Sequence, residues 1–227
     1  MTEPATTRRA RPGREPLTRE RVLRAALELA DARGIDAVSM RKLGEVLHVE
    51  AMSLYRYVDG KEAVLDGLAD LVTAEFDVPV RGGDWRAEVR RSAVSAHEAL
   101  LRHPWASSVL ESRMNPGPTR LRYLEAVLGV LREAGFDWAT VGRAFMAIDS
   151  HTYGFAMQEQ AWAFDPAVSD EIAATFAAML PGDAYPNLIA MATYSATGPD
   201  AVRPEFTFGL DLMLDGLERL RQGRAGE

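Results

Sequence analysis

An all-helical fold is predicted by three features of this sequence. Apolar residues recur at spacings of three and four along most of the chain. Runs in which apolar and polar residues alternate, as they do in half-buried strands, are almost missing. Clusters of glycine and proline divide the helical pattern into segments. With 227 residues, 47% of them hydrophobic, the chain can bury a substantial core.

The chain is predicted to begin with an arm and then a first helix. Residues 1–16 contain several prolines and arginines, a composition typical of a disordered basic arm. The arm either enters a minor groove or adds only nonspecific attraction to DNA. The first helix begins after Thr18, whose hydroxyl can cap it, and ends at Gly34.

Three more helices are predicted before residue 77. Ser39 can cap the second helix, and the third lies at about residues 50–58. Asp59 followed by Glu62 has the spacing of a capping box and opens the fourth helix. We therefore expect residues 17–76 to form a three-helix, N-terminal helix-turn-helix domain with a connecting helix.

The second and third helices have the arrangement of a helix-turn-helix motif. Residues 47–50 would form the turn, so that the third helix can enter a major groove while the second crosses the DNA backbone. Gly44 costs the second helix about 1 kcal/mol relative to alanine, so we expect it to permit a close helix crossing. A helical hairpin with a solvated charged face is the alternative.

The charge of the chain is distributed unevenly. Residues 1–61 carry 12 Lys and Arg against 9 Asp and Glu, a net charge of +3, whereas the formal charge of the whole chain is −7. A basic head on an acidic body suits a protein that places one end against nucleic acid. There is no cysteine, no secretory signal and no apolar run of membrane-spanning length, so we expect a cytoplasmic protein without a membrane partner.

The exposed side of the third helix and its surroundings carry the candidate DNA contacts. Ser53 and Arg56 can bind base edges or phosphates, and Ala51 and Met52 can meet a thymine methyl group. The remaining candidates favour phosphates, although Arg41 can also reach a guanine. The full predicted set is Arg41, Ala51, Met52, Ser53, Tyr55, Arg56, Tyr57 and Lys61.

Three sequence motifs in this region resemble those of one protein family. They are GIDAVSMRKL at residues 34–43, LYRY at residues 54–57 and KEAVL at residues 61–65. Together they resemble the DNA-binding domain of the tetracycline-repressor (TetR) family of bacterial regulators. The resemblance implies DNA contacts at Arg41, Ser53, Tyr55, Tyr57 and Lys61. His48 departs from the glycine that many members carry in the turn, and histidine tolerates the left-handed conformation better than most residues.

The C-terminal part resembles the ligand-binding half of the same family more loosely. RHPWA at residues 102–106, NPGP at 115–118, LREAGF at 131–136 and YGF at 153–155 carry this likeness. It implies a larger helical ligand-binding and dimerisation domain at residues 84–222, with a homodimer formed through helices at about 137–164 and 204–222. The further helices are predicted at about 84–102, 104–113, 118–134, 168–180 and 184–196.

The last predicted helix has a wide apolar stripe. It consists of Phe206, Leu210, Met213, Leu214, Leu217 and Leu220. The stripe can either form the dimer interface or close the core of the subunit, and we favour the interface.

The body also contains an excess of aromatic and methionine residues, which line many apolar pockets. Polar groups such as His97, Asp149 or His151 would orient a ligand. The predicted effector contacts are Trp105, Met114, Tyr123, Phe145, His151, Phe155, Gln158 and Trp162.

No cofactor, metal site or catalytic residue is predicted. The tetracycline repressor holds a drug-bound magnesium ion with a histidine and a glutamate, and the resemblance puts Leu110 and Gln158 near these positions. Neither is a good ligand for a hard cation, so we expect a different, larger and more apolar effector. Motifs of metalloproteases, phosphate-binding loops and serine hydrolases are missing.

The sequence thus predicts a transcriptional regulator, with repression favoured over activation. It would bind an inverted-repeat operator in double-stranded DNA as a dimer and be released by a small-molecule effector. A helical adaptor that binds only proteins is the rival hypothesis.

Overall fold

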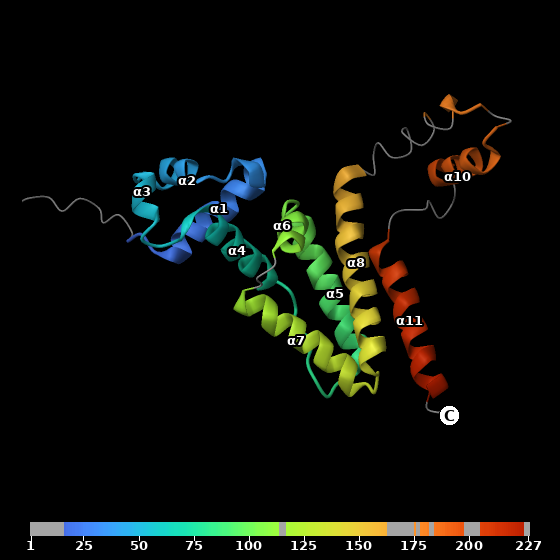
Figure 1. Cartoon of the computed structure of the whole chain (residues 1–227). Helices are drawn as coiled ribbons and strands as arrows, with labels where there is room; N and C mark the ends of the chain where they lie inside the picture. The colour runs from blue at the N-terminus through green and yellow to red at the C-terminus, as the bar shows by residue number, and fades with distance from the viewer. Residues whose placement is uncertain are drawn as a thin grey trace, which may run out of the picture. The chain divides into compact units, whose positions relative to one another are not determined.

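The computed structural model describes residues 16–113, 117–162, 175, 178–181, 184–197 and 205–224. Within these ranges the regular structure is entirely helical. The helices are α1 (Arg19–Arg33), a short 3-10 helix η1 (Ile35–Ala37), α2 (Met40–Leu47), α3 (Ala51–Leu54), α4 (Gly60–Thr73), α5 (Trp85–Arg102), α6 (Ala106–Ser112), α7 (Pro118–Glu133), α8 (Trp138–Trp162), α10 (Pro186–Thr197) and α11 (Phe206–Arg224) (Figure 1).

The chain divides into two compact units, residues 1–64 and 65–227, so the boundary falls within α4. In the first unit, the caps predicted at Thr18 and Ser39 are confirmed. The Thr18 hydroxyl accepts a hydrogen bond from the Arg21 backbone N–H at 3.2 Å, and Ser39 Oγ accepts one from Lys42 N–H at 3.2 Å. Gly34 ends α1 with φ 80°, a conformation that glycine adopts without a steric penalty.

The third helix is shorter than predicted. We expected residues 50–58, but α3 ends at Leu54. Beyond it, the N–H groups of Tyr57 and Val58 both donate to the Leu54 carbonyl, so the chain tightens into a turn. The turn leads to Gly60, whose φ of 84° is incompatible with a continuing helix.

In the second unit, α5, α7, α8 and α11 pack around a common core, and Figure 1 shows α5, α8 and α11 side by side. Trp85 at the start of α5 meets the edge of Phe136 with ring centroids 5.2 Å apart. The buried members of this core are Trp85, Val89, Ala93, Val127, Val130, Leu131, Phe136, Val141, Ala144, Ile148, Phe206, Leu210, Leu214 and Leu217.

This packing corrects our assignment of the apolar stripe on α11. Phe206, Leu210, Leu214 and Leu217 belong to the core of the subunit and are not available to a second copy. They face inward because α11 lies across both α5 and α8. Of the predicted stripe, Leu220 remains exposed, and the apolar side chains on the outer side of α11 are instead Phe208 and Leu212.

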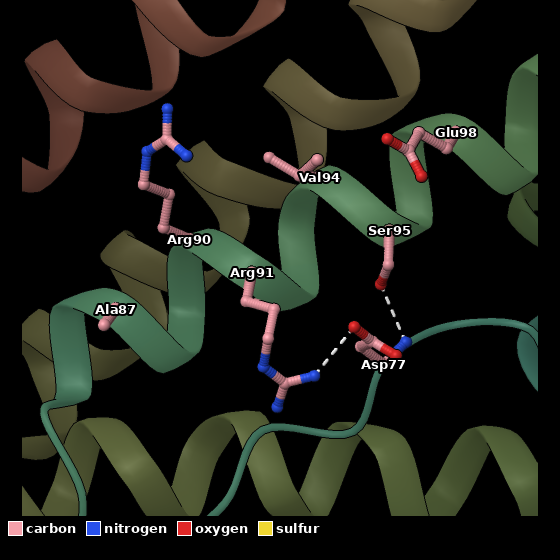
Figure 2. Close-up of a pocket in the computed structure, with 7 residues that line it drawn as sticks. All are labelled: Asp77, Ala87, Arg90, Arg91, Val94, Ser95 and Glu98. Carbon is pink, nitrogen blue, oxygen red and sulfur yellow. Dashed lines mark hydrogen bonds and ion pairs between the residues drawn. The ribbon is translucent and has the colours of Figure 1, made fainter.

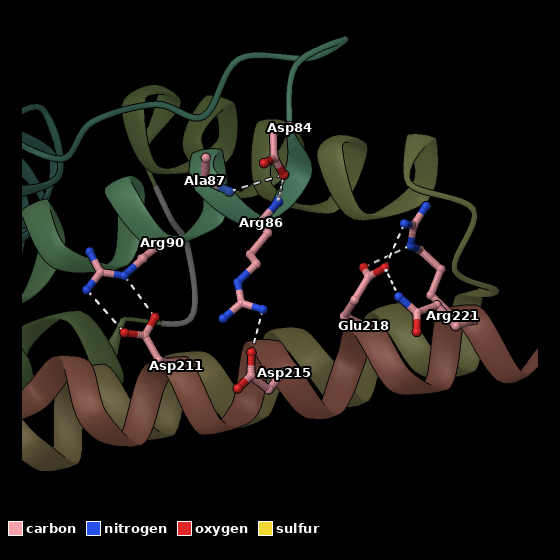
Figure 3. Close-up of polar contacts among 9 residues, drawn as sticks. Asp84, Arg86, Ala87, Arg90, Asp211, Asp215, Glu218 and Arg221 are labelled. Atoms are coloured by element: carbon pink, nitrogen blue, oxygen red, sulfur yellow. Dashed lines mark hydrogen bonds and ion pairs between the residues drawn. The ribbon is translucent and has the colours of Figure 1, made fainter.

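Ion pairs fix the direction of α11 along α5. Arg90 binds Asp211 through Nε at 2.8 Å and through Nη2 at 3.2 Å, and Arg86 Nη1 lies 2.5 Å from Asp215 Oδ1 (Figure 3). Such partly exposed pairs stabilise a fold by only about 0–1 kcal/mol each, so they orient the helix more than they hold it.

The remaining helices agree with the predicted ranges to within a few residues. The segment at 77–84 is non-helical, as Pro79, Gly82 and Gly83 indicate. The predicted helix at 168–180 and the arm at 1–16 lie largely outside the described residues. No helix in the described ranges has both the length and the apolar character needed to cross a membrane.

Candidate DNA-binding surface and effector cavity

The first candidate site surrounds α3 in the N-terminal unit. Six of the eight predicted DNA contacts are exposed, and the other two, Ala51 and Ser53, are half-buried within α3. Met52 is 76% exposed, so its side chain is free to contact a partner. Leu54 is buried, so α3 turns one face to the core and the opposite face to solvent.

Gly44 holds α3 close to α2. A Cβ atom at this position would lie 2.8 Å from the Val49 carbonyl oxygen and 3.1 Å from the Ala51 backbone nitrogen. Real Cβ atoms do not approach backbone atoms this closely, so only glycine fits. The predicted reason for a glycine in this helix is confirmed.

His48 reverses the chain between the two helices. It has φ 56° and ψ 46°, the left-handed conformation, and is the one non-glycine residue of the described ranges with positive φ. Its N–H donates to the Glu45 carbonyl at 3.2 Å, which closes the end of α2. The turn predicted at residues 47–50 is confirmed, and with Gly44 it sets the angle at which α3 leaves α2.

Arg41 and Lys42 share one carboxylate on α2. Arg41 Nη1 lies 2.6 Å from Glu45 Oε1, and Lys42 Nζ lies 2.8 Å from Oε2. The Lys42 hydrogen bond lowers the pKa of Glu45, and the charges of Lys42 and Arg41 add to this effect. Since the Arg41 side chain is 81% exposed, its pair with Glu45 is weak and can be exchanged for a phosphate.

The second candidate site is a cavity in the C-terminal unit, between the chain after α4 and helices α5, α7 and α8. Its lining residues are Phe76, Ala93, Ala96, Tyr123, Val127, Phe145, Ile148, Asp149, Thr152 and Tyr153. The space left between them is ≈ 30 Å³, enough for one or two water molecules. Two predicted ligand contacts, Tyr123 and Phe145, therefore lie in one cavity.

Tyr123 is held in place from two sides. Its hydroxyl accepts a hydrogen bond from Ser92 Oγ at 3.2 Å, and its ring meets the edge of Phe76 with centroids 5.3 Å apart. Burial raises the pKa of Tyr123 to about 12, and burial likewise raises the pKa of Tyr153. Both phenols are therefore neutral at physiological pH and can donate hydrogen bonds.

Asp149 is the acidic residue of this cavity. Burial raises its pKa to about 6, the like charge of Glu111 adds to the increase, and the charge of Arg120 opposes it. A carboxyl group perturbed mainly by desolvation within a cavity is a frequent feature of binding sites. The carboxylate is still the major form above pH 7.

His151 and Phe155 belong to a separate aromatic cluster. Phe206 is stacked on His97, with ring centroids 4.2 Å apart, and on His151 at 4.9 Å. His151 Nε2 lies 2.9 Å from the Phe206 carbonyl oxygen, and Gly209 leaves room for the imidazole. These contacts bind α11 to α5 and α8, so the cluster has a structural role that the sequence did not indicate.

The other predicted ligand contacts do not join the cavity. Trp105 is buried beside His103, with ring centroids 5.9 Å apart, and Gln158 is exposed. Met114 and the Trp162 side chain lie outside the described residues. The predicted contacts did not include Phe76 or Tyr153. Phe76 lies in the segment taken as a connection, and Tyr153 was counted in the aromatic excess of the body but not selected as a contact.

A larger surface depression on α5 is a weaker candidate. It measures ≈ 410 Å³ and is lined by Asp77, Ala87, Arg90, Arg91, Val94, Ser95 and Glu98 (Figure 2). Its guanidinium groups already have partners, since Arg91 pairs with Asp77 at 2.8 Å and Arg90 binds Asp211. An incoming anion would have to break these pairs, so we favour the aromatic cavity. No group of metal-ligating side chains occurs in the part of the chain that the structure describes.

Comparison with known proteins identifies the family of both parts of the chain. Residues 22–68 match the family of bacterial regulatory proteins called tetR, and residues 78–221 match the tetracycline-repressor-like C-terminal domain. The chain belongs to the TetR family. It is therefore a ligand-responsive, DNA-binding transcriptional regulator.

Several relatives of this TetR-family regulator match it over nearly their whole length. The HTH-type transcriptional repressor DrrR1 of Streptomyces coeruleorubidus is 35% identical, over 96% of this chain and 84% of that protein. The class A tetracycline repressor of Escherichia coli is 32% identical, over 88% of this chain and 90% of that protein. The structure of ActR of Streptomyces coelicolor in complex with actinorhodin matches with a TM-score of 0.75 at 25% sequence identity. The match covers 93% of this chain and 100% of ActR.

Proposed function

We propose that this regulator is a dimeric repressor that binds an inverted-repeat operator and is released by a small effector. The Gly44 contact is the observation that best supports the DNA-reading assignment. It fixes α3 against α2, while Met52, Tyr55 and Lys61 stay exposed beside it. The similarity to the transcriptional repressor DrrR1 favours repression over activation. A repressor of bacterial genes would act in the cytoplasm.

Dimerisation is supported by apolar side chains that remain exposed on two helices. They are Met146 and Met157 on α8, and Phe208, Leu212 and Leu220 on α11. Burying them against a second copy would remove apolar surface from water. Two recognition helices related by a twofold axis would then read half-sites about 34–36 Å apart.

The effector is proposed to enter the aromatic cavity. Phe76 lies three residues after the end of α4, and its ring contacts Tyr123 on α7. A ligand that separates these rings would therefore also displace the end of α4. Asp66 and Asp70 on α4 bind Arg113 and the first turn of α7. Movement of α4 would change the position of α3, which precedes it in the chain.

This coupling obeys thermodynamic limits. The effector can weaken operator binding only by its difference in affinity for the two conformations. The coupling free energy is typically about 1–3 kcal/mol, and operator DNA must weaken effector binding by the same factor. A magnesium-dependent effector does not fit, because Leu110 has no donor atom and Gln158 is a poor ligand for a hard cation.

Selection of bound sequences from a random duplex pool tests the operator proposal. We expect the purified protein to enrich an inverted repeat, and affinity to fall steeply with salt as counterions are released. Tyr55→Ala and Lys61→Ala should each weaken binding by about tenfold or more, and Lys61→Ala should also reduce the salt slope by about one. Arg143→Ala, which removes an exposed cation from α8, serves as the matched control.

Two outcomes would contradict the proposal. If a folded dimer enriches no sequence at low salt, the protein-binding adaptor becomes the better hypothesis. If a palindrome is enriched but Tyr55→Ala and Lys61→Ala bind it normally, the regulator reads DNA through a different surface.

A further inference from the structure

The aromatic cavity contains one negatively charged group. Among its described lining residues, Asp149 is the one that carries a charge at neutral pH, and the remaining side chains are apolar, phenolic or hydroxyl. It lies on α8 between Phe145 and Tyr153, one turn from each. A solitary carboxylate among aromatic rings restricts the ligands that this cavity can accept.

The Asp149 carboxylate makes no hydrogen bond or ion pair with any side chain that the structure describes. Arg120 is the basic residue whose charge acts on it, but the Arg120 guanidinium donates to the Leu110 carbonyl. Glu111 is the other charged group that acts on Asp149, and it is repulsive. In the free protein the negative charge is therefore offset only through space by Arg120, with no cation bound directly to it.

The other polar groups of the cavity offer little to an anion. The Thr152 hydroxyl donates to the Ile148 carbonyl at 2.8 Å, so its proton is already engaged. The Tyr123 hydroxyl accepts from Ser92, so its own proton and that of the Tyr153 hydroxyl can still be donated, but these neutral groups carry no positive charge to offset Asp149. An anionic ligand would lie against Asp149 without a cation to bind, whereas a cationic ligand would find both the carboxylate and the electron-rich faces of the rings.

We propose that the cavity binds an aromatic organic cation, whose ammonium group pairs with Asp149 while its flat body packs among Tyr123, Phe145 and Tyr153. This inference rests on the proposed effector role of the cavity and narrows its ligand class. Rings recognise a cation through their quadrupoles, and a partly buried carboxylate adds a charge-assisted hydrogen bond.

The electrostatics of Asp149 support the same assignment. Because burial raises its pKa to about 6, the ionised carboxylate is less stable in the free protein than it would be in water. A bound ammonium group would compensate the charge and lower this pKa again. The small space of ≈ 30 Å³ requires that the aromatic body separate the Phe76 and Tyr123 rings as it enters.

Three naphthalene probes of similar size test this inference by calorimetry at pH 7.5 with the whole chain and no DNA. They are 1-naphthylmethylamine, which is a cation, 1-naphthylmethanol, which is neutral, and 1-naphthylacetate, which is an anion. We expect the cation to bind about tenfold more tightly than the neutral probe, as one partly buried ion pair implies, and the anion to bind more weakly than both.

Asp149→Asn should remove this preference, so that the cation and the neutral probe bind equally. The variant keeps the side-chain volume and removes a desolvated charge, and we therefore expect it to fold at least as well as the parent protein. Glu125→Gln, which removes an exposed carboxylate from α7, should leave the preference intact.

The inference is overturned if the neutral or anionic probe binds as tightly as the cation, if Asp149→Asn retains the preference, or if no probe binds. Operator binding of the same proteins is measured separately without probes. Loss of operator binding with an intact cation preference would refute the proposed function but not the assignment of the cavity. Normal operator binding without a cation preference would refute only the assignment of the cavity.

Discussion

Asp70 on α4 caps the first turn of α7 through Thr119. Asp70 Oδ1 accepts a hydrogen bond from the Thr119 backbone N–H at 3.0 Å, and Asp70 Oδ2 accepts one from the Thr119 hydroxyl at 3.0 Å. The Arg120 N–H also donates to Oδ1 at 3.3 Å. Gly117, the N-cap residue of α7, has no side chain that could accept these hydrogen bonds. The cap of a cavity-lining helix is thus supplied by α4.

Removing this cap should affect both stability and regulation. We expect Asp70→Ala to lower the free energy of unfolding by about 1–2 kcal/mol, because the first N–H groups of α7 lose their acceptor. Since α4 would then be less tightly joined to α7, effector should release operator DNA less efficiently. Urea unfolding measures the first effect, and operator titration with and without effector measures the second.

Two variants make this prediction specific. Asp66→Ala breaks only the partly exposed pair with Arg113 at 3.3 Å and should cost less than about 1 kcal/mol. Gly117→Ala should behave like Asp70→Ala, because the added Cβ atom would collide with the Asp70 carboxylate and displace it. Normal effector response in Asp70→Ala and Gly117→Ala would show that the coupling runs elsewhere.

Two glycines within helices should respond to alanine in opposite directions. Gly44→Ala places a Cβ atom 2.8 Å from the Val49 carbonyl oxygen, and the resulting strain of about 1–3 kcal/mol should exceed the gain in helix propensity. Gly142→Ala on α8 meets nothing within 4 Å and should stabilise the protein by up to about 1 kcal/mol.

Thermal unfolding and operator binding of these two variants test the assignment of Gly44. We expect Gly44→Ala to bind operator more weakly than the parent at temperatures at which both are folded, since α3 must move away from α2. Operator affinity of Gly142→Ala should not change. Equal stabilisation by both substitutions would be incompatible with the close crossing.

Most of the fold could be predicted from local signals in the sequence. Thr18, Ser39 and Gly34 act as caps because their chemistry satisfies helix ends without help from the rest of the chain. Gly44 was informative for a related reason. A residue that is unfavourable in its own helix must be explained by a neighbour, and the neighbour is the start of α3.

The predictions from the sequence that were wrong concern long-range packing, which local periodicity does not encode. An apolar stripe such as that of Leu210 and Leu214 indicates burial but not whether the covering surface belongs to the same chain. The end of α3 depends on the reversal at Gly60. The cavity brings together residues as distant as Phe76 and Tyr153, and the sequence alone could not separate them from the His151 cluster.

Asp149 should make stability depend on pH in a defined direction. Its pKa is about 6 in the folded protein and near 3.8 when unfolded, so the folded state binds the proton more tightly. The contribution of Asp149 is therefore fully present below about pH 4 and is lost as pH rises through 6. At pH 8 the desolvated carboxylate should cost about 3 kcal/mol relative to its protonated form.

Comparison of Asp149→Asn with the parent protein isolates this effect. The variant should gain stability relative to the parent by about 2 kcal/mol between pH 4.5 and pH 8, as measured by urea unfolding. Glu125→Gln should show no such gain, because Glu125 is exposed. A pH-independent difference between Asp149→Asn and the parent would mean that the carboxyl group is better solvated than its position indicates.

The outer side of α11 should be required for dimerisation, whereas its inner side should be required for folding. Leu212 is 55% exposed, while Leu210, two residues away, is fully buried in the subunit core. Leu212→Asp should therefore leave the helical fold intact and shift the protein to monomers, because an aspartate would be desolvated at the interface between copies. Leu210→Asp should prevent folding, since the charge would enter the core.

Sedimentation equilibrium and operator binding measure the consequence for Leu212→Asp. A monomer presents one recognition helix, so its affinity for a full inverted repeat should fall to about that of the parent protein for a single half-site. Leu121→Asp, which introduces the same charge at a 54% exposed leucine on α7, should remain dimeric. A dimeric Leu212→Asp protein with normal operator affinity would place the interface outside this side of α11.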